Sequence, residues 1–232
     1  MAGSRLDTLR TRARRKADAV GNNFFSDAEV TDYINVGLGE LHDILVSKYE
    51  DYFVSSNSFS LTSGTSTYSF STLELTDFYK LLGVDMTIGN DTVRLKRFQF
   101  PERNRYEADA GIYTSRGYNM YEYAIRGSSI EFIPSPTSTD SMKIWYVPSF
   151  SPLSADSDKV EDGVTKNWEE YAVIVAAIKM RQKEESSSTS LEKDLDRITD
   201  RIEEASRNRD AAEPMAITDQ TIGMHDGRYW TG

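Results

Sequence analysis

The stretch that decides the fold is SSNSFSLTSGTSTYSFST, residues 55–72, in which twelve of eighteen residues are Ser or Thr. Its apolar residues alternate with polar ones on both sides of a Gly64-Thr65 turn, with Phe59 and Leu61 before it and Tyr68 and Phe70 after it. Alternation with a period of two predicts strands, not a flexible linker. We expect a β-hairpin that pairs Phe59 with Phe70 and has one apolar and one hydroxyl-rich face.

Further strand patterns follow this stretch and are separated mostly by polar or glycine-containing turns. They cover residues 80–88, 92–96, 121–126, 130–133 and 141–147. Short strands joined by such turns favour antiparallel pairing. Most of the span 52–148 is therefore predicted to form a small antiparallel β module.

Helical periodicity appears on both sides of this span. The predicted helices cover residues 4–20, 26–49, 167–185 and 189–205. Ser26 and Glu29 have the spacing of a capping box at the start of the second helix, and Asn167 is a favoured N-cap type for the third. Gly37 and Gly39 lie inside the second helix, where we expect them to allow close packing against another helix.

The order of these elements is two helices, a β module, two helices and a tail. Because strands and helices are segregated, the fold class is predicted to be α+β. We expect an antiparallel helical bundle built from N- and C-terminal helix pairs, with a small antiparallel β module inserted and an extended C-terminal tail. The corresponding ranges are 1–51 and 149–209 for the helix pairs, 52–148 for the β module and 210–232 for the tail.

Composition narrows the class of protein further. The chain has 232 residues, no cysteine and a net charge of −10. The missing cysteines exclude disulfides, thiolate catalysis and cysteine-based metal sites. No apolar run is long enough to span a membrane or to act as a signal core, which predicts a soluble, unsecreted protein.

The charge is distributed unevenly along the chain. Residues 1–20 carry a balance of +4 and residues 21–60 a balance of −6. The basic residues of the first segment are Arg5, Arg10, Arg12, Arg14, Arg15 and Lys16. Opposite charge on neighbouring segments favours ion pairs between helices or between copies of the chain. Contact with DNA passing through a channel is the alternative role for these residues.

The sequence nominates no catalytic, metal-binding or cofactor-binding residue. Its two histidines, His42 and His225, have no neighbouring residues arranged for acid–base or metal chemistry, so we expect structural positions for them. The 37 acidic residues leave a carboxylate-pair hydrolase as an alternative, because the separation of such a pair is set by the fold. We therefore predict a protein that is not an enzyme and binds no cofactor.

Several segments of the sequence match one family in number and order. They are SDAE (26–29), YIN (33–35), YFV (52–54), SFSL (58–61), FYKLLGVD (78–85), KRF (96–98), ERN (102–104), WYVP (145–148), WEEY (168–171), AAIKM (176–180) and NRD (208–210). In these segments the chain resembles the head-to-tail adaptor, or connector, proteins of short-tailed bacteriophages. The similarity spans roughly residues 5–215, and none of the segments is a catalytic signature.

The resemblance implies a structural virion protein. Such adaptors form a twelve-copy ring below the portal protein, extend the DNA channel, and carry the tail nozzle and fibre proteins. DNA is then expected to pass through the channel without specific binding, and the location is the neck of the virion, assembled in the host cytoplasm. A virion-associated peptidoglycan hydrolase that uses a carboxylate pair is the alternative.

The tail 210–232 is predicted to be the portal-binding element, since the C-terminal segment of such adaptors reaches the portal. Its apolar residues are the proposed anchors: Met215, Ile217, Ile222, Tyr229 and Trp230. Pro214, Gly223 and Gly227 disfavour a helix there. The alternative is a disordered terminus without a binding role.

Overall fold

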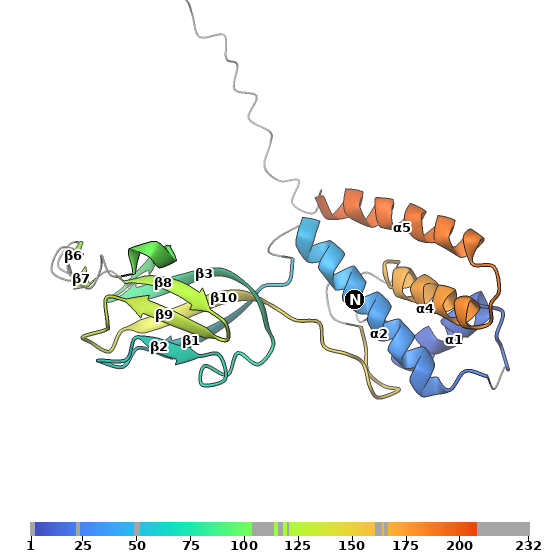
Figure 1. The fold of residues 1–232 in the computed structure, drawn as a ribbon, viewed down its shortest axis with the longest axis horizontal. Helices are drawn as coiled ribbons and strands as arrows, with labels where there is room; N and C mark the ends of the chain where they lie inside the picture. Colours follow the sequence, from blue (N-terminus) through green and yellow to red (C-terminus); the bar gives the residue numbers. More distant parts are fainter. Residues whose placement is uncertain are drawn as a thin grey trace, which may run out of the picture.

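The computed structural model describes residues 3–21, 24–48, 52–103, 114–115, 118–119, 121–160, 164 and 167–207. Within them the chain forms four helices and two four-stranded sheets. Helices gather at one end of the molecule and strands at the other (Figure 1). We refer to these two parts as the helix group and the sheet pair.

The helix group is organised around one buried helix. Its members are α1 (Leu6–Lys16), α2 (Asp27–Lys48), α4 (Glu169–Lys183) and α5 (Thr189–Arg207). All side chains from 171 to 178 on α4 are buried, and a helix that is apolar all round belongs in an interior. The other three helices each pack on α4. A helix of this composition is stable only when its neighbours cover it.

All four predicted helices are present, with differences at their ends. The Glu29 N–H donates to Ser26 Oγ at 3.2 Å, which confirms half of the predicted capping box. The N-cap prediction for Asn167 is wrong, because α4 begins at Glu169 and Trp168 occupies the N-cap position without a side-chain cap. Two carboxylates in the first turn, Glu169 and Glu170, favour the helix start electrostatically instead.

The strands form two main sheets and one short ribbon. The first sheet has the order β1 (Ser55–Ser60), β10 (Ser141–Pro148), β3 (Phe78–Ile88) and β4 (Asp91–Arg94), all antiparallel. The second has the order β2 (Thr67–Ser69), β9 (Ser129–Ile133), β8 (Glu122–Arg126) and β5 (Lys96–Arg97), in which β5 runs parallel to β8. Strands β6 (Thr114–Ser115) and β7 (Tyr118–Asn119) form the ribbon.

The predicted hairpin within residues 55–72 is wrong. Its two strands lie in different sheets: β1 pairs with β10, with Ser55 opposite Tyr146, and β2 pairs with β9. Between them the chain crosses from one sheet to the other. In this crossing the Gly64 N–H donates to the Pro136 carbonyl at 2.8 Å. The alternating pattern correctly predicted strands, but it contains no information about which strand is the partner.

The molecule is α+β, but the architecture predicted within this class is wrong. The molecule is not a helical bundle with a small β module inserted, because the strands form two four-stranded sheets with a core of their own. That core is rich in aromatic side chains from both sheets, including Phe70, Tyr68, Tyr121, Phe132 and Tyr146. The prediction of a small module underestimated the strands, because large aromatic side chains contribute to a core between the two sheets.

The helix group has a separate core that extends onto the sheets at one place. Val147 of β10 is fully buried in it, and Leu82 of β3 packs against it. The predicted tail 210–232 lies outside the described residues. Among the helices that are described, none combines the length and the apolar character needed to cross a membrane.

Candidate functional site

The basic residues near the N-terminus lie on α1 or directly before it, and most of them form ion pairs. The pairs are Arg10 with Asp156, Arg12 with Glu170, Arg14 with Asp27 and Lys16 with Glu170. Arg5 pairs with Asp7 at 3.0 Å, whereas the described residues supply no carboxylate to the exposed Arg15. The acceptors on Asp156 and Glu170 are far from α1 in sequence, so these cations hold α1 against the rest of the helix group.

Two adjacent carboxylates at the start of α4 are central to this arrangement. Glu169 is fully buried, and its Oε1 accepts a hydrogen bond from the Ser4 N–H at 2.6 Å. Burial alone would raise the pKa of Glu170, but hydrogen bonds from Lys16 at 2.5 Å and Arg12 at 2.6 Å outweigh it and hold that pKa below its ordinary value. These carboxylates therefore connect Ser4, Arg12 and Lys16 of the N-terminal segment to the start of α4.

His42 lies where α2 meets the sheet pair. It is 4% exposed, and its ring stacks on Phe53 at 5.0 Å between centroids. The Tyr79 ring meets it edge-on at 5.8 Å, and the Tyr79 hydroxyl donates to Asp43 Oδ1 at 3.0 Å. These contacts connect α2 to β3, so His42 has a structural position between the two parts of the molecule.

Protonation of His42 is expected to destabilise the protein in mild acid. Burial lowers the pKa of His42 below its ordinary value of 6.5, and the Asp43 carboxylate offsets only part of that effect. The unfolded chain therefore binds this proton more readily than the folded chain, and stability is lost as the pH falls below 6.5. We expect the melting temperature to fall more between pH 7.5 and 5.5 in the wild type than in a His42→Phe variant, which keeps the stacked ring. Equal losses in both proteins would contradict this assignment.

A second surface, which the sequence analysis did not nominate, lies at the edge of the second sheet. Strand β5 pairs with β8 through Arg97 and Tyr123, and the Phe98 N–H donates to the Tyr123 carbonyl at 3.0 Å. Phe98 is thereby buried, and the chain turns outward in a short 3-10 helix, Phe100–Glu102, with Pro101 in its first turn. This turn leaves the Phe100 ring 58% exposed, although a phenylalanine of this kind is usually buried.

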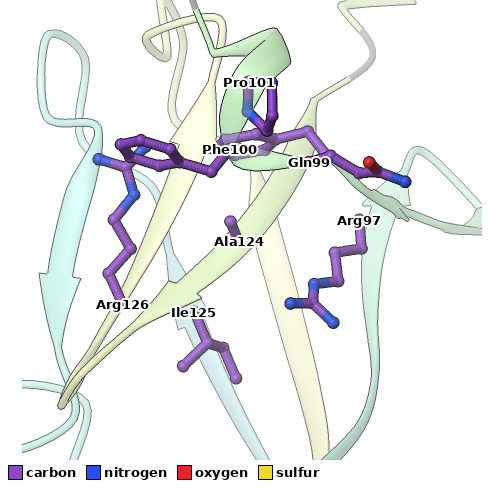
Figure 2. A pocket seen from close by; sticks show the side chains of 8 residues that line it. Arg97, Gln99, Phe100, Pro101, Ala124, Ile125 and Arg126 are labelled. Carbon is purple, nitrogen blue, oxygen red and sulfur yellow. The ribbon is translucent and has the colours of Figure 1, made fainter.

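Arginine side chains surround that exposed ring. The Arg103 guanidinium carbon lies 4.2 Å from the Phe100 centroid and that of Arg126 lies 4.9 Å from it. Both distances are within the range of cation–π attraction. Figure 2 shows Arg126 reaching the ring from β8 while Arg97 points away on the other side of a hollow of about 500 Å³. Glu131 holds Arg126 in place through an ion pair of 2.7 Å.

The chemistry of this hollow is that of a binding surface. We call it the Phe100 surface and define it by Arg97, Phe100, Arg103 and Arg126. It offers guanidinium groups to carboxylates and an aromatic ring to apolar side chains. The sequence contained a signal for it, since basic and aromatic residues alternate closely between 96 and 103. Their exposure depends on the turn at Pro101 and on strand pairing, which the pattern does not give.

The tail residues proposed to bind the portal, Met215, Ile217, Ile222, Tyr229 and Trp230, lie outside the described residues. Within the described part of the chain, no three His, Asp or Glu side chains gather where they could hold a metal ion. Neither models of known protein families nor curated proteins give a match to the sequence.

Proposed function

We propose that this chain is the subunit of a head-to-tail adaptor ring in a short-tailed bacteriophage, joining the portal to the tail nozzle and fibres. The observation that carries the proposal is the Phe100 surface, where a largely exposed aromatic ring lies against two guanidinium groups. Aromatic and arginine side chains provide most of the binding energy in protein interfaces. The particular partners come from the sequence segments that resemble such adaptors.

The ion pairs of α1 support the same proposal. Arg10, Arg12, Arg14 and Lys16 are already engaged with carboxylates of this chain. Affinity for DNA comes mainly from cations that are available to phosphates. We therefore propose that DNA passes through the ring without specific binding, and that the chain acts through contacts with proteins.

The two binding surfaces are assigned to different partners. In the sequence the tail comes after α5 of the helix group. The Phe100 surface belongs to the sheet pair at the other end of the molecule (Figure 1). We propose that the tail binds the portal and the Phe100 surface binds the nozzle or fibre protein. Binding to the portal and binding to the nozzle or fibre protein would then use separate parts of one subunit, and contacts between copies in the ring would use a third part.

Co-sedimentation with the portal tests this function. The full chain is expected to sediment with the portal in several copies, and a chain ending at residue 210 is expected to lose most of this binding. Phe100→Ala is the matched control, because it should leave portal binding unchanged and weaken binding to the nozzle protein by about tenfold or more. Full-chain protein that fails to bind the portal would refute the function, and release of products from cell-wall material would favour the hydrolase.

A further inference from the structure

Helices α1, α4 and α5 border a groove on one side of α4. Gly37 of α2 lies against Ala172 and Val175, so these residues mark the side of α4 that α2 covers. Glu170 and Ile174 instead line a groove between α1 and α5. At about 100° per residue, the two pairs of positions face nearly opposite directions around the helix axis. The groove therefore opens on the side of α4 away from α2.

We call this hollow, which has a volume of about 490 Å³, the α1–α5 groove. Its charged lining consists of the cations Lys16, Arg197 and Arg201 and the carboxylates Glu170 and Asp194. Ile174 and Ile198 lie at its floor and are almost completely buried, at 2% and 7% exposure. Arg201 is exposed, and the described residues supply it no ion-pair partner. Cations thus outnumber carboxylates here, in a chain whose net charge is −10.

One side of α2 carries the opposite charge, and Glu40 and Asp43 there also accept hydrogen bonds from the Tyr171 and Tyr79 hydroxyls of the same chain. Asp32, Val36, Glu40 and Asp43 are exposed there, with spacings of four, four and three residues that place them on one stripe, which we call the α2 face. Val36 is 44% exposed between carboxylates one turn away on each side. Asp32 and Glu40 are separated by about 12 Å along the helix, and Arg197 and Arg201 by about 6 Å.

We propose that the α2 face of one copy of this chain binds in the α1–α5 groove of the next copy, with Asp32 beside Arg201 and Val36 facing Ile198 at the floor of the groove. A second copy is the partner that this pair of surfaces fits, because every chain carries both halves of the contact. The inference rests on the proposed adaptor function in that it names the contact on which the ring would be built.

The position of the two surfaces gives the contact its geometry. They differ from each other and lie on opposite sides of α4, so one copy can use both at the same time. An interface between unlike surfaces repeats from copy to copy and produces a closed ring when the rotation closes. The charges on the two surfaces would also select the direction in which copies join.

Charge reversal tests the contact in the full chain on its portal. Asp32→Lys and Arg201→Glu should each weaken assembly by about tenfold or more, because like charges then face each other. The double variant Asp32→Lys/Arg201→Glu, or an equimolar mixture of the two single variants, should regain assembly. Asp196→Lys is the matched control, since Asp196 is exposed on α5 outside the groove lining and should tolerate the same reversal.

Cross-linking tests it independently, because the chain has no cysteine of its own. A Val36→Cys/Arg197→Cys chain should give a ladder of covalent multimers with a short bis-maleimide, both on the portal and at high concentration alone. Each single cysteine variant should give no product beyond a dimer.

Three outcomes are decisive. Unchanged assembly after either charge reversal, or the absence of a ladder in both settings, would overturn the contact even if copies still gather on the portal. A ladder together with restored assembly in the double variant would establish it. A ladder from a chain that never binds the portal would retain the contact and refute the adaptor function.

Discussion

Replacing Gly37 by alanine is expected to lower the free energy of unfolding by about 1–3 kcal/mol. A Cβ atom at Gly37 would lie 2.7 Å from the Ala172 Cα and 3.1 Å from the Ala172 carbonyl oxygen. Both are backbone atoms of the central helix α4, so relief requires α2 and α4 to move apart. Because α1, α2 and α5 all pack on α4, this movement would disturb much of the core of the helix group.

Gly39 provides the matched control on the same helix. A Cβ there meets only the Phe150 ring at 3.7 Å, which is ordinary van der Waals contact. Gly39→Ala should therefore stabilise the protein by up to about 1 kcal/mol, because alanine is the better helix former. Urea unfolding of the two variants beside the wild type measures both effects. A Gly37→Ala variant as stable as Gly39→Ala would contradict the close approach of α2 to α4.

Replacing Phe132 by alanine is expected to cost about 3–5 kcal/mol, the largest effect of any single substitution proposed here. Phe132 is fully buried on β9, where its ring lies 6.1 Å from Phe59 of the other sheet and 5.9 Å from Tyr68. Truncation removes a ring that contacts the other sheet and leaves a cavity in the shared core. Urea unfolding of the Phe132→Ala variant beside the wild type measures this loss in the free energy of unfolding.

Two further variants near Phe132 test the same contact between the sheets. Ser60→Ala changes an exposed side chain next to Phe59 on β1 and should alter stability by less than about 0.5 kcal/mol. A double-mutant cycle between Phe59 and Phe132 should give a coupling of about 0.5–1.5 kcal/mol. A coupling near zero would mean that the two sheets do not pack through this pair.

Local structure could be predicted from the sequence because it depends on neighbouring residues. Periodicity located the four helices and most of the strands, and the Ser26 capping box located the start of α2 within a residue. Strand pairing could not be predicted in this way, since it depends on residues far along the chain. β1 and β10 are an example, because the two strands are about eighty residues apart in the sequence. The turn at Gly64 instead predicted that β1 pairs with β2.

The candidate binding surfaces, too, could be predicted only where they depend on local sequence. Residue type and spacing showed the basic cluster of residues 5–16, but its acceptors Asp156 and Glu170 come together with it only in the folded molecule. The exposure of Phe100 and the opening of the α1–α5 groove also depend on tertiary packing. Which side chains are exposed depends on how the core packs, so these surfaces follow from the tertiary fold and not from the local sequence pattern.

The pairing of Ser55 with Tyr146 also has a consequence for the order in which the chain folds. It brings together the points where the chain leaves α2 and returns toward α4. Without it, joining those helices would close a loop of about 120 residues, an entropy loss worth about 4 kcal/mol. Once the sheets have formed, that loop is reduced to residues 49–54 before β1 and residues 149–168 after β10. We therefore expect the sheet pair to fold first, so that a substitution at its aromatic core also slows the docking of α4 on α2, although it contacts neither helix.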